Sequence, residues 1–140
     1  MTEQTYTGGC GCRSIRYEST AEPLLMAHCQ CRDCQEQTGG GHASLLVFPK
    51  AAVKISGAPA EYSSTADSGK RKTRGFCSTC GSPLYTFFES MPDAFVLKAS
   101  SLDDPTVFRP QMVLYTDRGY DWDYLDPSLA RFAKMPPTSS

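Results

Sequence analysis

The sequence lacks a long hydrophobic run and a strong excess of charge of either sign. Its longest apolar stretch, Ala43–Phe48, is interrupted by Ser44 and is far shorter than the roughly 20 residues that a membrane-spanning helix needs. Among 140 residues, 14 lysines and arginines nearly balance 15 aspartates and glutamates, for a net charge of −1. We therefore expect no bulk electrostatic binding to nucleic acid or to an acidic membrane surface.

The N-terminal residues also lack the features of a secretory signal. Residues 1–5 contain neither a basic start nor an apolar stretch, so we expect a cytoplasmic protein. An apolar content of 40% is sufficient for a folded core, and this length suits one compact domain. We expect a single domain over residues 1–140, with its core at about 6–132 and a flexible tail at 135–140.

Cysteine, in contrast, is abundant and clustered. The seven cysteines are Cys10, Cys12, Cys29, Cys31, Cys34, Cys77 and Cys80. Because the count is odd, a fully paired disulfide framework would leave one thiol over. Cysteines one or two residues apart rarely bridge, whereas they suit two ligands of one metal ion. Thiolates with no other obvious ligand favour zinc, and separated pairs make an iron–sulfur cluster the weaker alternative.

The seven thiolates divide into a group of four and a group of three. A closed four-sulfur site is structural, while a three-ligand site leaves one position open for chemistry. One division combines the two C-x-x-C pairs as a zinc ribbon and leaves a loose trio. The other keeps the three cysteines of residues 29–34 together and joins the remaining four. We favour the second division, because three ligands within six residues can surround one ion from a single loop.

These motifs and their order resemble those of the glutathione-dependent formaldehyde-activating enzyme (GFA) family, over nearly the whole chain. The matching stretches are Gly9–Cys12, His28–Cys34, Gly75–Leu84 and Ser101–Pro105. The resemblance implies a mainly β, zinc-stabilised, β-tent-like domain of short antiparallel sheets with few short helices. It also implies two zinc ions per chain. Because a site with three ligands can be partly empty, the second ion can be substoichiometric. The implied structural zinc ligands are Cys10, Cys12, Cys77 and Cys80, and the implied catalytic zinc ligands are Cys29, Cys31 and Cys34.

The activity for which this family is named condenses glutathione with formaldehyde to S-hydroxymethylglutathione. The resemblance therefore implies a carbon–sulfur lyase or synthase whose partners are glutathione or another small thiol and a small aldehyde. The main alternative is a non-catalytic protein-interaction module with two structural zincs. A redox switch through Cys31 and Cys34 is a weaker alternative, because the motif lacks the strand–turn–helix setting of thioredoxin-like sites.

The residue types agree with thiol chemistry. Three thiolates weaken zinc as an activator of water but leave it a good acceptor for one more soft ligand. A thiol bound there would lose its proton and could attack an unhindered aldehyde.

Two further features of the sequence each have a functional and a purely structural interpretation. The basic residues Lys70, Arg71, Lys72 and Arg74 could bind the carboxylates of glutathione, or could form a solvated loop edge. His28, beside Cys29, could donate a hydrogen bond or carry a proton near the metal, or could be a partly buried histidine bonded to backbone.

Short alternating patterns dominate the predicted secondary structure. Strands are predicted at residues 14–17, 42–48, 53–55, 84–88, 94–99 and 112–115. One or two helical turns are predicted over Arg32–Thr38, closed by the glycines that follow. A second short helix is predicted over Pro127–Lys134, with Asp126 as its N-cap.

Overall fold

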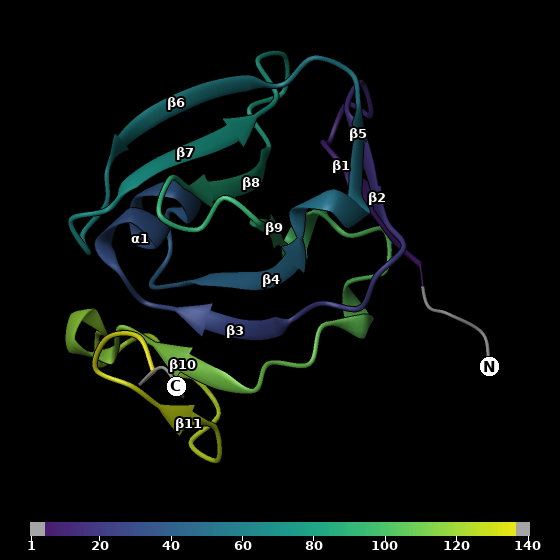
Figure 1. Cartoon of the computed structure of the whole chain (residues 1–140). Helices are drawn as coiled ribbons and strands as arrows, with labels where there is room; N and C mark the ends of the chain where they lie inside the picture. Colours follow the sequence, from purple (N-terminus) through teal and green to yellow (C-terminus); the bar gives the residue numbers. More distant parts are fainter. Residues whose placement is uncertain (1–4, 137–140) are drawn as a thin grey trace.

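The computed structural model describes residues 5–136 and consists mainly of short β-strands (Figure 1). The strands are β1 (Tyr6–Gly9), β2 (Arg16–Ser19), β3 (Leu25–Cys29), β4 (Ala43–Pro49), β5 (Val53–Ser56), β6 (Ala60–Thr65), β7 (Arg71–Phe76), β8 (Pro83–Phe88), β9 (Ala94–Lys98), β10 (Met112–Leu114) and β11 (Ala130–Arg131). The α-helix is α1 (Arg32–Thr38), and short 3-10 turns lie at Lys50–Ala52, Ala99–Ser101, Pro105–Val107 and Thr116–Arg118. The mainly β fold class expected from the sequence is confirmed.

The strands form two sheets. The smaller sheet has three strands in the order β1-β2-β5, and the larger has eight in the order β11-β10-β3-β4-β9-β8-β7-β6. Within the larger sheet β10 pairs in parallel with β3 and β11, and the other pairs are antiparallel. No helix among residues 5–136 is long and apolar enough to cross a membrane.

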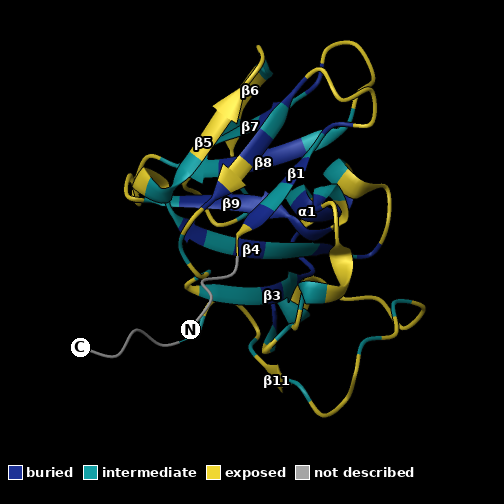
Figure 2. Ribbon diagram, turned by 90° about the vertical axis from the view of Figure 1, so that its right-hand side faces the viewer, coloured by how far each residue is buried: buried dark blue, intermediate teal, exposed yellow. Residues whose placement is uncertain are grey.

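The larger sheet divides the interior into two apolar clusters, because successive side chains of a strand point to opposite faces. On the core face, Leu46, Phe48 and Leu97 pack with Tyr6 and Tyr17 of the smaller sheet. Figure 2 shows the buried residues running along β4, β8 and β9. We call the opposite side the α1 face, because α1 packs against β4 there and covers the second, smaller cluster.

Most predicted elements are confirmed with small shifts of their ends. The helix occupies Arg32–Thr38 as predicted, and Gly39 ends it in a left-handed conformation with φ of 75°. The six predicted strands correspond to β2, β4, β5, β8, β9 and β10. The patterns missed β1, β3, β6, β7 and β11, of which β7 contains most of the basic run.

The predicted C-terminal helix over Pro127–Lys134 is wrong. The Asp126 carboxylate accepts hydrogen bonds from the Ser128 backbone N–H at 2.9 Å and from its hydroxyl at 2.7 Å, which fixes a turn. The chain then extends as β11 beside β10, and the Phe132 N–H donates to the Val113 carbonyl at 3.0 Å. Backbone groups that a helix would bond internally are thus used to extend the sheet. The predicted flexible tail at 135–140 falls mostly outside the described residues.

Two candidate metal centres

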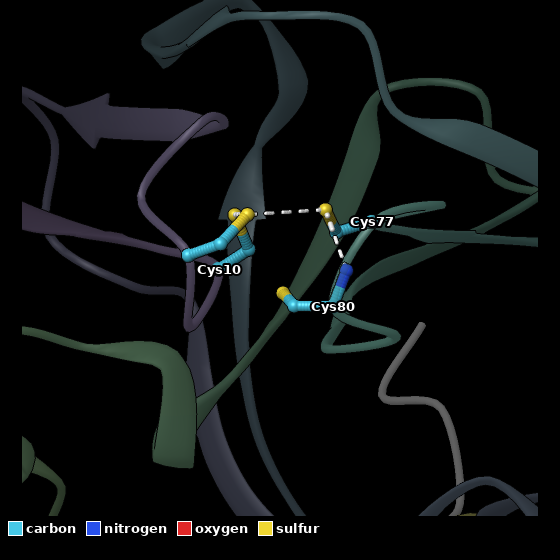
Figure 3. Close-up of side chains that lie close together, drawn as sticks. Cys10, Cys77 and Cys80 are labelled. Atoms are coloured by element: carbon cyan, nitrogen blue, oxygen red, sulfur yellow. Dashed lines mark hydrogen bonds between the residues drawn. The ribbon is translucent and has the colours of Figure 1, made fainter.

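The first candidate metal centre connects the two sheets. Cys10 and Cys12 lie in the turn between β1 and β2, and Cys77 and Cys80 lie in the turn between β7 and β8 (Figure 3). The four sulfurs lie within 4.8 Å of one another. The sulfur of Cys12 is 3.6 Å from that of Cys10 and 3.7 Å from that of Cys77. A tetrahedron with zinc–sulfur bonds of about 2.3 Å has sulfurs about 3.8 Å apart, so this group fits one metal ion.

Backbone amides point at the two buried sulfurs of this centre. The Ile15 N–H donates to Cys10 Sγ at 3.3 Å. The N–H groups of Thr79 and Cys80 both donate to Cys77 Sγ at 3.4 Å. Hydrogen bonds of this kind stabilise a thiolate, which is the form that binds a metal. The local turns therefore hold the two buried sulfurs in place with backbone donors.

The pKa values of this centre differ in direction. Ser14 lowers the pKa of Cys12, but the contacts with Cys10 and Cys77 and burial raise it overall. Burial alone would raise the pKa of Cys10, but the Ile15 amide and the Ser14 hydroxyl lower it to about 7. The hydroxyl and the backbone amide of Ser82 lower the pKa of Cys80 to about 5. Cys80 is also exposed to solvent, as is Cys12, whereas the other two cysteines are buried.

The second candidate metal centre lies within six residues on the α1 face. Cys29 ends β3, Cys31 is the N-cap of α1, and Cys34 lies in its first turn. The Cys31 sulfur accepts a hydrogen bond from the Cys34 N–H at 3.4 Å, so it caps the helix as well. The three sulfurs lie within 4.8 Å of one another. Only 6%, 9% and 5% of these residues, in chain order, are exposed to solvent.

The close packing of the three thiols separates their pKa values. Hydrogen bonds from the thiols of Cys29 and Cys31 hold the pKa of Cys34 well below its usual range. The same contacts raise the pKa of Cys29, because a second thiolate beside the first is unfavourable in a buried cluster. A divalent cation among the sulfurs would remove this repulsion and deprotonate all three.

The tip of the β6–β7 hairpin and the segment after β10 pack against this centre. The Asp67 N–H donates to the Asp33 carboxylate of α1 at 2.5 Å. The guanidinium of Arg118 holds both oxygens of Asp67 at 2.9 and 2.8 Å and keeps the pKa of that carboxyl below its usual range. The buried Gln35 amide donates to the carbonyls of Gln30 and Arg118, both at 2.9 Å. Three chain segments are thus fixed around the trio.

Two buried lysines lie near the second centre, and sequence reasoning had not connected Lys98 with it. Lys98 on β9 is 4% exposed and Lys72 on β7 is 5% exposed. The ammonium group of Lys98 donates to Thr86 Oγ1 at 3.1 Å and to Gln37 Oε1 at 3.3 Å. Burial lowers the pKa of Lys98, and the negative charge of Cys34 opposes that shift. The signal in the sequence was a lysine inside an otherwise apolar strand.

The structure does not bring the four basic residues of the 70–74 run to one place. Lys70 closes the β6–β7 turn, where its carbonyl accepts from the Ala66 N–H at 2.8 Å, and the other three lie along β7. Lys70 and Arg71 are exposed, whereas Lys72 points into the interior. The Arg74 guanidinium lies over the Tyr62 ring, 5.2 Å from its centroid. Of these four residues, Lys72 acts on Cys34 of the second centre, where it lowers the pKa, and substrate binding by the run stays a prediction.

His28 does not face the cysteines, because it and Cys29 are successive residues of β3 and point to opposite sides. Its Nδ1 lies 3.0 Å from the Ser44 hydroxyl, and its ring contacts the rings of His42 and Phe108. Burial lowers the pKa of His28 to about 4, so the ring is neutral at pH 7. His28 therefore does not face the second centre. The expected partial burial is confirmed, but its hydrogen-bond partner is the Ser44 hydroxyl and not the backbone.

Two surface cavities of about 350 Å³ each lie away from the second centre. One is beside the first centre and is lined by Cys10, Arg13, Arg16 and Asp103, among others. The second cavity lies over β2 and β5. Neither of these two cavities reaches the buried trio, which is enclosed by the hairpin tip and by α1.

Comparisons with known proteins identify relatives of this chain. Residues 5–118 match the GFA family, described as glutathione-dependent formaldehyde-activating enzyme. A Halomonas elongata protein named "Putative glutathione-dependent formaldehyde-activating enzyme" is 27% identical over 124 residues, which cover 82% of this chain and 77% of that protein. The crystal structure of a Rhodobacter sphaeroides protein has a similar fold, with a TM-score of 0.55 at 20% identity, over 69% of this chain and 87% of that one. The chain belongs to the GFA family.

Proposed function

We propose that this protein is a zinc-dependent carbon–sulfur lyase or synthase that joins a small thiol, such as glutathione, to a small aldehyde, such as formaldehyde. Family membership supports the reaction class. The observation that carries the proposal is the contrast between the two centres. One offers four sulfurs, which complete a tetrahedron, and the other offers three, which leave a position for a further ligand.

The donors of both centres suit zinc. Thiolates are soft ligands, and the short distances between the sulfurs leave room for one ion per group. When bound at the second centre, zinc would supply a position at which a thiol loses its proton at neutral pH. Cys29, Cys31 and Cys34 would hold that ion, and the remaining four cysteines would hold a structural one.

The reaction balances without a redox partner. The carbon–sulfur bond forms from the thiol sulfur and the carbonyl carbon, the carbonyl π bond breaks, and the thiol proton ends on the new hydroxyl oxygen. The reverse reaction releases the thiol and the aldehyde. The protein's contribution is to hold the sulfur beside the aldehyde in a buried place, where proximity and exclusion of bulk water both accelerate the step.

The test is exchange NMR on glutathione and formaldehyde with and without the zinc-loaded protein. The adduct forms spontaneously, so only acceleration counts. We expect acceleration by the native chain and its loss in Cys31→Ser. This substitution keeps a good helix N-cap, and circular dichroism would check that the fold is retained. Full acceleration by Cys31→Ser would contradict the assignment of the reaction to the second centre.

A protein-interaction module with two structural zincs is the second candidate function. The burial of the trio favours it, because a buried centre that neither of the two described cavities reaches is typical of a structural site. In a module, loss of a cysteine from either group should destabilise the fold to the same degree. Thermal unfolding of variants from the two groups distinguishes the candidates. Unequal losses of thermal stability favour the enzyme, and equal losses favour the module.

A further inference from the structure

By the strand register and the alternation of side chains, Lys72 and Lys98 lie on the α1 face of the larger sheet, the same face as Cys29. In the strand register, Cys29 lies opposite Ala43 of β4. Two residues further along β4, and so on the same face, Leu45 lies opposite Lys98 of β9. Val96, two residues before Lys98, pairs with Thr86 of β8. Thr86 pairs with Arg74 of β7, so that Arg74 and Lys72 are both on this face. Arg74 is half-buried and lies over the Tyr62 ring, whereas Lys72 and Lys98 are buried on the same face as the second centre.

Neither ammonium group forms an ion pair with a carboxylate among residues 5–136. The hydrogen bonds of Lys98 go to neutral oxygens of Thr86 and Gln37. A lysine is rarely buried to this degree unless it is paired, because an isolated buried charge is unfavourable. The negative groups that interact with Lys98 are the three cysteines of the second centre, foremost Cys34. Lys98 also donates to Gln37 of α1, the helix that contains Cys34, and both lysines lower the pKa of Cys34, so the sulfurs are the counter-charge of the two lysines.

The net charge of the second centre with a bound metal ion is the sum of the charges of its groups. Three thiolates and a divalent ion carry a net charge of −1, and two ammonium groups bring the buried assembly to +1. An additional thiolate would make it neutral. Water or imidazole in the same position would leave the positive charge uncompensated away from solvent. The first centre lacks this arrangement, since its Cys12 and Cys80 are exposed and solvent screens their charge.

We propose that Lys72 and Lys98 are positioning residues that make the second centre selective for an anionic sulfur, so that it binds thiols as thiolates in preference to neutral ligands. This inference rests on the proposed function, because it takes the second centre to bind a metal and to be open to a thiol. It adds a substrate criterion: the thiol is chosen by the charge of its sulfur, and not by carboxylates elsewhere in the molecule.

The test uses the full chain loaded with Co²⁺, whose absorption reports a newly bound sulfur and a newly bound nitrogen differently. Glutathione, 2-mercaptoethanol and imidazole are titrated against the native chain, Lys98→Met and Lys72→Met. Lys54→Met is the matched control, since Lys54 is an exposed lysine on β5 of the other sheet. We expect each buried-lysine variant to bind both thiols about tenfold more weakly, with imidazole affinity changed by less than about twofold. The control should match the native chain.

Several results would overturn this inference. If the variants bind thiols and imidazole more weakly by the same factor, the lysines only support packing. If the affinity for thiols is unchanged, the lysines have no role in thiol binding. If the lysine variants bind glutathione more weakly but 2-mercaptoethanol as tightly as the native chain does, the lysines bind the carboxylates of glutathione and not the sulfur. Lys72→Arg keeps the charge and should bind thiols within about threefold of the native chain, which preserves the test if a methionine variant does not fold.

The titration contains no aldehyde, so it is independent of the exchange experiment. Thiolate selectivity that depends on the lysines, without acceleration of adduct formation, would contradict the proposed function alone. Acceleration of adduct formation together with unchanged thiol binding in the lysine variants would contradict this inference alone.

Discussion

The two cysteine centres differ in how the chain supplies their ligands. The first draws on two turns more than sixty residues apart and connects the two sheets, with two of its cysteines exposed. The second takes all three ligands from one strand end and one helical turn, and it is fully buried. Closing a long loop restricts the unfolded chain more than closing a short one. Metal at the first centre should therefore stabilise the fold more, and metal at the second is better placed for chemistry.

Removing one ligand from each centre should give the largest difference between them. We expect Cys10→Ser to lower the melting temperature by about 15 °C or more, because a long-range metal cross-link is lost. Cys31→Ser should lower it by less than about 5 °C, since serine keeps the helix cap. Differential scanning calorimetry of the zinc-loaded proteins measures both changes. Equal losses would remove the distinction on which the enzyme proposal depends.

The alkylation rates of the cysteines at the two centres should differ by about tenfold or more. Immediately after chelator is added at pH 7, Cys80 should be alkylated first, since it is exposed and its pKa is lowered to about 5. Cys29 should react last, since it is buried and its pKa is raised. Lowering the pH through about 5 protonates Cys80 and should abolish its advantage. Mass spectrometry of the modified peptides follows this order, and equal rates for the two cysteines would contradict it.

The smallest expected effect concerns the hairpin tip over the second centre. The Arg118 guanidinium lowers the pKa of Asp67, so the pair stabilises the tip above the ordinary value of 3.8 and this contribution is lost as the pH falls through the lowered pKa. We expect Asp67→Asn to change the melting temperature by less than about 2 °C, because the pair is partly exposed. Metal should leave the second centre about threefold faster, with the first centre unchanged.

Competition between the metal-loaded protein and a coloured chelator would measure the two release rates for Asp67→Asn. The exposed pair Arg32 and Glu36 on α1 provides a matched control, and Glu36→Gln should leave both rates unchanged. Faster release from the first centre in Asp67→Asn would show that the substitution acts on the whole fold and not on the tip.

Much of the cysteine arrangement could be predicted from the sequence. Spacing alone left two divisions of the seven cysteines open, and preference for a compact trio pointed to the one that the structure contains. Helix α1 was predictable because Gly39 ends a short polar segment that starts in the C-x-x-C motif. These features depend on local geometry, which the sequence carries directly.

The surroundings of the second centre could not be predicted, because they depend on long-range pairing. The side on which His28 lies is fixed by its neighbours in β4, and the approach of Lys98 depends on the register between β4 and β9. Lys72 was singled out, but within a run treated as one unit; period-two alternation along β7 separates it from Arg71. The C-terminal helix failed for the same reason, since the partner strand β10 overrides local capping signals.

The most direct test of the account is zinc X-ray absorption spectroscopy on the chain with two zinc ions, before and after a small thiol is added. With four sulfurs at one centre and three at the other, we expect an average of about 3.5 sulfurs per zinc, rising to about 4 when the thiol binds. Lys98→Met should need more thiol to reach the same end point. An average of four sulfurs without thiol, or no change on its addition, would contradict the claim that the second centre is open to a thiolate.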